Sequence, residues 1–517
     1  MSLARDVTTV GSATLLSRLL GFFRDVGIAA ILGAGGLSDA YFAALQIPNL
    51  FRRLLAEGAL NAALLPMWLR VREERGASDL RQFGEQILGS MFLGAGLITL
   101  VCLLAAPIVV RIVAPGFDPA GERFDLAVQF VRLSAPYVAV AGLVAVAASV
   151  LNAEKRVGAA AFGIVVFNGV LVAAVLLVLT LGSASRLAGD ILSFAVVLAG
   201  LGQLLLVGGA VLRQPSLPHW FSLRISTDVH RFYARAIPGV IAGGIPQLKL
   251  MAGAMVASSS QSGVSWLYYA NRLYELPLGV ASVAIASVLA PRIAASVLTG
   301  ERGAAAAAQT RAFEIACGLA LPAAMAFTVL STPIAGGLFQ RGAFGPGDTV
   351  AVAAALSAIS AGLPGHVLEK VFGAVSFAHD DTHTPMYAAL AGLTVATVTA
   401  LWLFPHYGHV GIAAAIAASG WVGAALLFAI LWRRGWLAVD PGIWRRLAGI
   451  ILSTAIMGAV IVGGNHVLES AFVASATGRL AMLAILVTAG LGVYLTSLHL
   501  LGIARMRELL AAVQERF

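Results

Sequence analysis

Long apolar runs follow one another along almost the whole chain, separated by short polar segments. A helix that crosses a bilayer needs about 20 consecutive, mostly apolar residues. Runs of that length predict fourteen spanning helices, at 8–32, 37–66, 85–110, 126–150, 159–181, 190–212, 234–257, 264–290, 310–331, 348–376, 385–404, 410–432, 446–464 and 480–502. We therefore expect an all-α polytopic membrane protein.

The composition agrees with this expectation. Hydrophobic residues make up 59% of the 517 residues and charged residues 11%, whereas soluble proteins have about 45–50% and about 25%. So few charges could not cover the surface of a water-soluble protein of this size, and a disordered chain or a nucleic-acid-binding domain is equally excluded. Cys102 and Cys317 lie in apolar runs, so no disulfide or metal framework is expected.

The distribution of Lys and Arg predicts the orientation in the membrane. Arg18, Arg24 and Asp25 interrupt the first apolar run, so it is expected to be a retained helix and not a cleavable signal peptide. With the N-terminus in the cytoplasm, the cytoplasmic segments carry 21 Lys and Arg residues and the opposite loops carry five. Because Lys and Arg are enriched in cytoplasmic loops, both termini are expected to be cytoplasmic.

The chain also contains an internal repeat with an offset of 227 residues. Residues 36–43 (GLSDAYFA) resemble residues 263–270 (GVSWLYYA), and Gly116-Phe117 matches Ala343-Phe344 at the same offset. Each repeat holds six predicted helices, an even number, so the two repeats are parallel, with a site expected between them near the midplane. The expected domains are an N-terminal lobe at 1–225, a C-terminal lobe at 226–435, and two extra helices with a cytoplasmic tail at 436–517.

Charged residues inside the predicted helices are the most informative feature of the sequence. A charge at the centre of a spanning helix costs about 2.5–3.5 kcal/mol, so most of these side chains are expected to face a hydrated cavity, pair with each other or reach the membrane surface. Cations outnumber acids by eight to five, which predicts an anionic substrate. The cations are Arg18, Arg24, Arg52, Arg53, Arg132, Lys249, Arg272 and Lys370, and the acids are Asp25, Asp39, Glu57, Glu275 and Glu369.

Several of these residues have a structural reading beside the functional one. Arg53 and Glu57 are four residues apart and favour a structural ion pair, and Arg132 near a helix end is expected to reach the membrane surface. Arg24 and Asp25 are neighbours that point about 100° apart on a helix, so each is expected to find its partner elsewhere.

The readings of the later charges stay open. Arg272 lies three residues before Glu275, so a local pair is possible, while Pro277 favours a cavity-lining position. Lys249 lies in a run rich in Gly and Pro that is expected to be bent or broken, and it is equally compatible with a cavity charge, a titrating group and a structural role. Glu369 and Lys370 are adjacent and therefore splayed.

Enzymatic motifs do not fit the chain. None of its three lysines follows a glycine, so there is no Walker A loop, and no HExxH sequence occurs. His379 and His383 are four residues apart, but they lie at a predicted helix–loop junction just before Pro385, which disfavours a metal site. We expect a transporter without a cofactor or a resident metal.

Residues 17–68 carry a family resemblance. The stretch SRLLGFFRDVGIAAILGAGGLSDAYFAALQIPNLFRRLLAEGALNAALLPMW closely resembles the opening of the MurJ (MviN) family, bacterial lipid II flippases of the multidrug/oligosaccharidyl-lipid/polysaccharide exporter superfamily. Residues 265–291 (SWLYYANRLYELPLGVASVAIASVLAP) resemble the eighth helix of that family. The length and the organisation as six, six and two helices extend the resemblance over the whole chain.

The resemblance implies that the protein moves lipid II, the undecaprenyl-diphosphate-linked peptidoglycan precursor, from the inner to the outer leaflet of the bacterial cytoplasmic membrane by alternating access. It implies that the arginines matching Arg18, Arg24, Arg52 and Arg272 line the central cavity, with Asp39 and Glu57 in matching positions and the two extra helices forming a groove for the lipid tail. Asp25, Glu275, Lys249 and Lys370 are expected to support the cavity. The expected partners are lipid II and membrane lipids, and the expected oligomeric state is a monomer.

Two departures from the family pattern bear on energy coupling. The stretch that usually resembles AR-x-DTKTP reads Ala378-His-Asp-Asp-Thr-His-Thr-Pro385 here, and the seventh helix carries Lys249 where some members have a carboxylate for sodium. Sodium coupling is therefore not expected, and membrane potential and protons remain alternatives. The alternative function is a drug/cation antiporter of the same superfamily, which would need a cavity dominated by acids and aromatics.

The orientation can be tested by cysteine accessibility. Cysteines introduced into the loop at 257–263 should react with a membrane-impermeant thiol reagent added outside the cell, and cysteines introduced at 67–84 should not, because the positive-inside rule places the first loop outside and the second inside. The reverse labelling pattern would show that the orientation is wrong.

Overall fold

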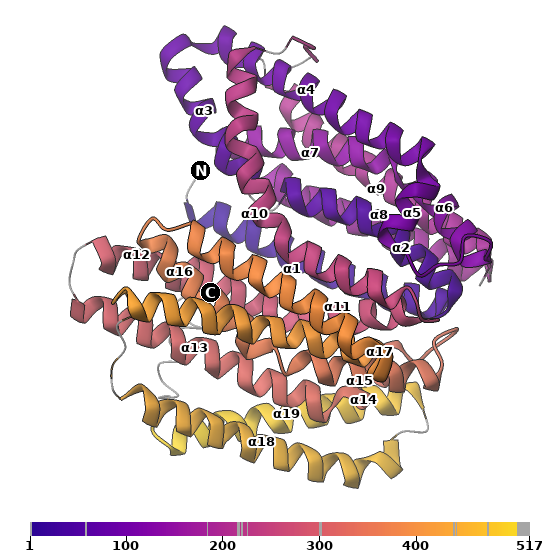
Figure 1. Ribbon diagram of the computed structural model, residues 1–517, viewed down its shortest axis with the longest axis vertical. Coiled ribbons are helices and arrows are strands. Elements are labelled where there is room, and N and C mark those ends of the chain that lie inside the picture. Colours follow the sequence, from indigo (N-terminus) through magenta and orange to yellow (C-terminus); the bar gives the residue numbers. More distant parts are fainter. Residues whose placement is uncertain are drawn as a thin grey trace. The chain divides into compact units, whose positions relative to one another are not determined.

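The computed structural model describes residues 3–56, 59–182, 185–214, 218, 221–224, 226–298, 302–437, 440, 442–472 and 475–503. Within these ranges every regular element is a helix and no strand occurs. The predicted all-α class is therefore confirmed (Figure 1).

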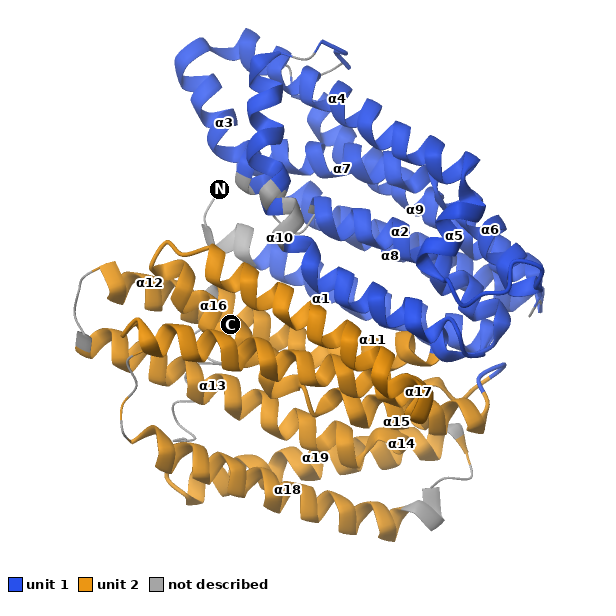
Figure 2. Cartoon of the chain, in the orientation of Figure 1, with its two compact units in different colours: residues 1–265, 342–344 blue, residues 266–341, 345–517 orange. Residues whose placement is uncertain are grey.

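The chain forms two compact units (Figure 2). Unit 1 comprises residues 1–265 together with the short segment 342–344. Its helices are α1 Leu3–Leu32, α2 Gly36–Ala56, α3 Ala59–Arg75, α4 Ala77–Leu104, α5 Ala106–Val113, α6 Glu122–Ser134, α7 Pro136–Ala153, α8 Val157–Leu181, α9 Arg186–Leu212 and α10 Thr227–Ala257.

Unit 2 comprises residues 266–341 and 345–517. Most of α11 belongs to it, although this helix begins in unit 1. Its helices are α11 Gly263–Ala284, a π-helical turn at Ile285–Leu289, α12 Ala290–Leu298, α13 Arg302–Val329, α14 Ser331–Phe339, α15 Pro346–Ser360, α16 Leu363–Ala378, α17 His383–Arg433, α18 Ile443–Phe472 and α19 Ala476–Leu500.

Among the described residues, nine helical segments are long and apolar enough to cross a membrane. Many of them expose large apolar side chains, such as Leu97 on α4, Leu176 on α8 and Leu205 on α9, because the solvent for these faces is lipid. The chain is a multi-pass membrane protein. Each of the fourteen predicted ranges overlaps a helix, but the number of membrane crossings stays a prediction.

Proline divides three of the predicted spans into two helices each. α5 carries Pro107 in its first turn, α7 begins at Pro136, and α16 carries Pro364 in its first turn. Proline lacks an N–H group and so cannot complete the hydrogen bond to the carbonyl four residues earlier, which ends the preceding helix, while proline suits the first turn of the next. The spans predicted at 85–110, 126–150 and 348–376 are therefore helix pairs.

A glycine marks the turn between the two predicted spans at 385–404 and 410–432. α17 is one run of helical residues except at Gly408, which has φ 54 and ψ −138 and divides it into two arms. A β-carbon at Gly411 would lie 2.9 Å from the backbone of Leu403, so the arms fold closely together there. Gly408 thus lies between the end of one predicted span at 404 and the start of the next at 410. α10, by contrast, runs unbroken from Thr227 to Ala257, so of the two expected alternatives for the helix around Lys249 the break is wrong and the bend stays a prediction.

The boundary between the compact units differs from the boundary predicted from the repeat. α10 packs on α2 and α3, and its Val229, Phe232 and Ala236 lie in one buried cluster with Trp68 of α3. This apolar contact keeps α10 in unit 1, whereas the repeat assigns it to the second lobe. The lobes at 1–225 and 226–435 are defined by the similarity of the two repeats in sequence, and this division of the chain stays a prediction.

Candidate functional site

Arg24 on α1 is held in a polar cluster of unit 1. Its Nε and Nη2 donate to Oδ1 of Asp25 at 2.9 and 2.7 Å, and its Nη1 donates to Oδ1 of Asn168 on α8 at 3.2 Å. Asn168 in turn donates to Oγ of Ser17 at 3.0 Å. The Asp25 side chain is fully buried and that of Arg24 is 15% exposed. The guanidinium plane is therefore fixed by a carboxylate and an amide from two helices.

The expectation that Arg24 and Asp25 must find separate partners is wrong. Neighbouring helical residues do point about 100° apart at the β-carbon. The arginine side chain has four rotatable bonds, however, and it reaches back to the shorter Asp25. α1 and α8 are close enough to enclose the pair, since a β-carbon at Gly27 would lie 2.3 Å from Val175.

The other predicted cations of unit 1 lie in different environments. Arg18 on α1 is exposed, Arg52 on α2 is half-buried and interacts electrostatically with Tyr137, and Lys249 on α10 is 7% exposed. Arg132 is exposed near the end of α6. Glu57, and with it the predicted Arg53–Glu57 pair, lies outside the described residues.

Asp39 at the start of α2 is fully buried and caps the beginning of α11. Its carboxylate accepts hydrogen bonds from the backbone N–H of Ser262 at 2.8 Å, from the backbone N–H of Ser265 at 2.9 Å and from the Ser265 hydroxyl at 2.5 Å. The Arg123 guanidinium lies 3.6 Å away. A buried carboxylate at a helix N-terminus is stabilised by the free N–H groups and by the helix dipole. Asp39 therefore fastens the α10–α11 turn to α2.

In unit 2, Arg272 and Glu275 form the local pair that their spacing allows. Arg272 Nη1 lies 3.3 Å from Glu275 Oε2, and the two side chains are 29% and 23% exposed. Lys370 on α16 is exposed, and its neighbour Glu369 is half-buried. α11 continues through Pro277 as far as Ala284, where the π-helical turn follows.

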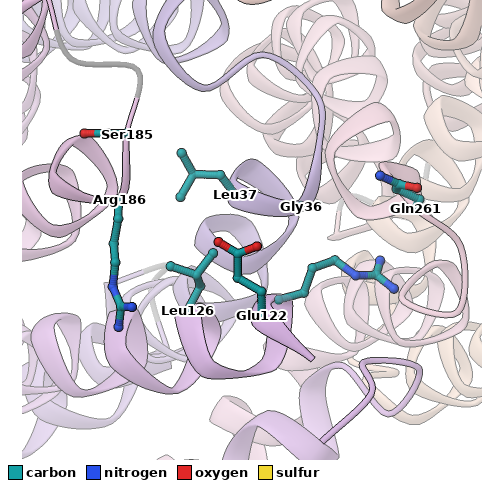
Figure 3. Close-up of a pocket in the computed structure, with 8 residues that line it drawn as sticks. Gly36, Leu37, Glu122, Leu126, Ser185, Arg186 and Gln261 are labelled. Carbon is teal, nitrogen blue, oxygen red and sulfur yellow. The ribbon is translucent and has the colours of Figure 1, made fainter. Parts of the chain in front are cut away.

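Unit 1 contains a cavity of about 630 Å³ (Figure 3), and Arg123, the ion-pair partner of Asp39, is one of its lining residues. It is lined by Gly36, Leu37, Glu122, Arg123, Leu126, Ser185, Arg186 and Gln261. These residues lie in or next to the turns that the orientation analysis places outside the cell. None of the predicted cavity arginines lines it, so this cavity does not bring those arginines together.

The loop with the two spaced histidines has a structural role. His379 stacks on Trp436 with a centroid separation of 4.3 Å, whereas His383 packs against Tyr387. Asp381 between them accepts from the backbone N–H groups of His383 and Thr384, both at 3.0 Å, and pairs with Arg434. Burial raises the pKa of Asp381, but the hydrogen bonds from Thr384 and Arg434 outweigh it and lower this pKa to about 2. The loop thus starts α17 with an ionised cap.

Reasoning from the sequence missed the polar residues that orient the charges. Asn168 was a detectable signal, since it is the one amide in the apolar run of α8. Ser262 and Ser265 gave no such signal, because serine is common in turns and their role depends on the approach of α2.

Comparison with known proteins identifies extensive similarity. Residues 28–483 match the model of the family described as lipid II flippase MurJ. A probable lipid II flippase MurJ of Rhizobium tropici is 37% identical over 506 residues, which cover 97% of this chain and 95% of that protein. Another probable lipid II flippase MurJ, of Rhizobium meliloti (strain 1021), is 40% identical over 462 residues, which cover 89% of this chain and 86% of that protein.

A solved structure supports the fold. A lipid II flippase MurJ in an inward closed conformation superposes with a TM-score of 0.79 at 22% identity, covering 94% of this chain and 97% of that one.

The polar cluster around Arg24 generates a stability prediction. Asp25→Asn should lower the free energy of unfolding by about 3–5 kcal/mol, because it leaves the Arg24 charge buried without its carboxylate. Asn168→Ala removes neutral hydrogen bonds and one charge-assisted contact, and should cost about 1–2 kcal/mol. The measurement is thermal unfolding of the purified variants in detergent. Equal losses in both variants would contradict the ion pair as the main contact, and an Arg24→Gln/Asp25→Asn double variant should recover part of the loss.

Proposed function

This chain belongs to the lipid II flippase MurJ family, and from that premise we propose how its charged residues recognise the substrate. It is a transporter and not an enzyme: it flips lipid II across the membrane by alternating access. Lipid II carries a diphosphate between its sugar headgroup and its lipid tail, and that group is the most highly charged part of the molecule. We propose that Arg18, Arg24, Arg52 and Arg272 bind this diphosphate.

The observation that carries the proposal is that two of these arginines are each held by a carboxylate on their own helix. Arg24 pairs with the residue that follows it, and Arg272 pairs with a residue three positions later. Pairing lowers the free-energy cost of keeping an arginine inside a membrane protein when no substrate is bound. A diphosphate offers more oxygens in the geometry that a guanidinium prefers. The arginines thus exchange an internal carboxylate for the substrate, so each guanidinium is paired with an anion at both stages.

The remaining residues have supporting roles in this proposal. Asp25 and Glu275 hold Arg24 and Arg272 between transport events, and Glu57 does the same for the cations of α2. Lys249 and Lys370 add positive charge, and Asp39 supports the site through the turn that begins α11. Arg18 is exposed and Arg52 is half-buried, so part of each side chain is accessible to a ligand.

We further propose fourteen membrane crossings arranged as two parallel six-helix repeats and two C-terminal helices, with both termini in the cytoplasm of the bacterium. The contact between Ser38 and Ser265 supports the repeat, since their hydroxyls lie 2.9 Å apart and the residues are separated by 227 positions, the offset of the repeat. Two equivalent residues can touch each other only close to the axis that relates them.

A second pair of contacts in unit 1 obeys the same relation. The N–H of Gly116 donates to the Ser258 hydroxyl at 2.8 Å, and the N–H of Ala343 donates to the carbonyl of Ala30 at 2.8 Å. Gly116 and Ala343 are equivalent at offset 227, and Ser258 corresponds to the residue after Ala30. The loop of each repeat thus contacts the end of the other repeat's first helix, as a two-fold relation requires.

The two C-terminal helices are proposed to hold the lipid tail. α18 and α19 pack against each other and onto α13 and α14 within unit 2, and they expose apolar side chains such as Leu452, Val460 and Leu491. A polyprenyl tail is an apolar chain that such a surface would accommodate. We propose that the protein acts as a monomer.

A drug/cation antiporter is disfavoured by the charge balance inside the helices. Such a transporter would need an excess of acids to attract its cationic substrate, whereas this chain has eight cations against five acids. The Arg24–Asp25 and Arg272–Glu275 pairs use up two of those acids.

The diphosphate proposal can be tested by complementation of a strain depleted of its own lipid II flippase. Replacing Arg24, Arg52 or Arg272 by Ala should abolish growth, because each loss of a charge-assisted contact costs about 1.5–3 kcal/mol, roughly tenfold to hundredfold in binding. Lys at these positions should restore only part of the function, since a point ammonium cannot make a bidentate contact.

Arg132→Gln is the matched control, because Arg132 is exposed near the end of α6. It should support growth, with membrane levels of every variant checked by immunoblot. Growth of all three Ala variants at normal expression would overturn the proposal.

A further inference from the structure

A partly buried tyrosine–histidine contact joins α11 to α16 within unit 2. The hydroxyl of Tyr274 lies 2.7 Å from Nδ1 of His366, and the two rings meet edge to face with centroids 6.0 Å apart. Tyr274 is 3% exposed, so its hydroxyl depends on this hydrogen bond in place of water. Each residue lies within its helix, Tyr274 in α11 and His366 in α16, and α16 belongs to a segment long and apolar enough to span the membrane.

The same ring nitrogen also has a second partner. Nδ1 of His366 lies 3.1 Å from the carbonyl oxygen of Gly362, one turn earlier on α16. A hydroxyl can donate to a bare nitrogen, whereas a carbonyl can only accept from an N–H. With Nδ1 bare, His366 accepts a hydrogen bond from the Tyr274 hydroxyl, and with Nδ1 protonated it donates one to the Gly362 carbonyl. A partner for either state of Nδ1 is already in place.

A carboxylate stands on the same face of α16. Glu369 follows His366 by three residues, so their side chains are neighbours on the helix surface, and Glu369 interacts electrostatically with Tyr274. Two glycines of the second arm of α17 make room for the pair. A β-carbon at Gly420 would lie 2.6 Å from Nδ1 of His366, and one at Gly423 would lie 2.9 Å from the Glu369 carboxyl carbon.

The other charged groups described on the helices around this pair are engaged or exposed, and the titratable Cys317 of α13 is buried. α13 presents Phe313 to Phe372 of α16, and α17 presents the two glycines. Arg272 pairs with Glu275 on α11, Glu314 on α13 pairs with Arg311 and Arg446, His409 on α17 contacts the carbonyl of Ala351, and Arg292 on α12 and Lys370 on α16 are exposed.

We propose that His366 and Glu369, tied to α11 by Tyr274, form a proton-binding site that couples the movement of protons to transport. A proton from water adds to Nδ1 of His366, and the imidazolium is balanced by the Glu369 carboxylate and bonded to the Gly362 carbonyl. The Tyr274 hydroxyl then loses its acceptor, so the tie between α11 and α16 is released. What this release drives rests on the proposed function, since α11 also carries Arg272 two residues before Tyr274.

The experiment is transport of lipid II by purified protein in liposomes between about pH 5.5 and about pH 8, the range in which histidine titrates. The wild-type rate should rise on acidification with one midpoint, by up to about tenfold, because protonation releases α11. His366→Asn keeps an acceptor for Tyr274 but cannot take up the proton, so its rate should vary by less than about twofold over this range. Glu369→Gln should move the midpoint by about one pH unit to lower pH, because the imidazolium loses its counter-charge.

His466→Asn is the matched control, since His466 is exposed on α18 and distant from the pair along the chain; it should keep the wild-type profile. A His366→Asn protein that retained the wild-type profile, or a wild-type rate that was flat or fell on acidification, would overturn the proton site. A wild type that transported no lipid II at any pH would instead overturn the proposed function.

A second measurement tests the proton site even if the His366→Asn variant does not transport lipid II. Nitrogen resonances of labelled histidine in the purified wild type, assigned by their absence from His366→Asn, report the titration of His366 without transport. Titration within this pH range, moved to lower pH in Glu369→Gln, supports the site. A His366 that stayed in one protonation state throughout would overturn it.

Discussion

The free-energy cost of a charge inside a membrane-spanning helix is the constraint on which the rest of this protein depends. Leaving the cations bare would cost about 2.5–3.5 kcal/mol each at mid-membrane, and the structure avoids this with carboxylates at short range, Asp25 for Arg24 and Glu275 for Arg272. In the function proposed above, these pairs hold the guanidinium groups ready for an anion. Under that proposal, stability without substrate and recognition of a diphosphate use the same arginines.

Much of the fold could be predicted from the sequence, because lipid imposes long apolar helices and prolines and glycines mark their ends. The turn at Gly408 lies between two predicted spans, whereas the helix breaks next to Pro136 and Pro364 were not predicted, although the missing N–H group of proline explains them. The position of α10 does not follow from any local rule. Its place in unit 1 depends on side chains such as Phe232 packing beside Trp68 from a distant part of the chain, and no local pattern reports that contact.

The charged residues of the candidate site could be located by their cost in an apolar run, but not their partners. Helical geometry at the β-carbon suggested that Arg24 and Asp25 face different neighbours, and the flexibility of the arginine side chain overrides that argument. Asn168, Ser265 and the Tyr274–His366 contact act through distances between helices far apart in sequence. A sequence shows which charged side chains cost free energy to bury, whereas the structure is needed to show which partners offset that cost.

The exchange of a carboxylate for substrate at Arg272 is the central claim, and it is tested most directly by calorimetric binding of lipid II to two variants of the purified protein. The account predicts opposite signs. Arg272→Ala should bind about tenfold or more weakly, because a charge-assisted contact is lost, whereas Glu275→Gln should bind at least as tightly as the wild type, because Arg272 no longer has to leave its carboxylate. A comparable loss of affinity in both variants would contradict the exchange and would mean that the pair itself contacts the substrate as a unit.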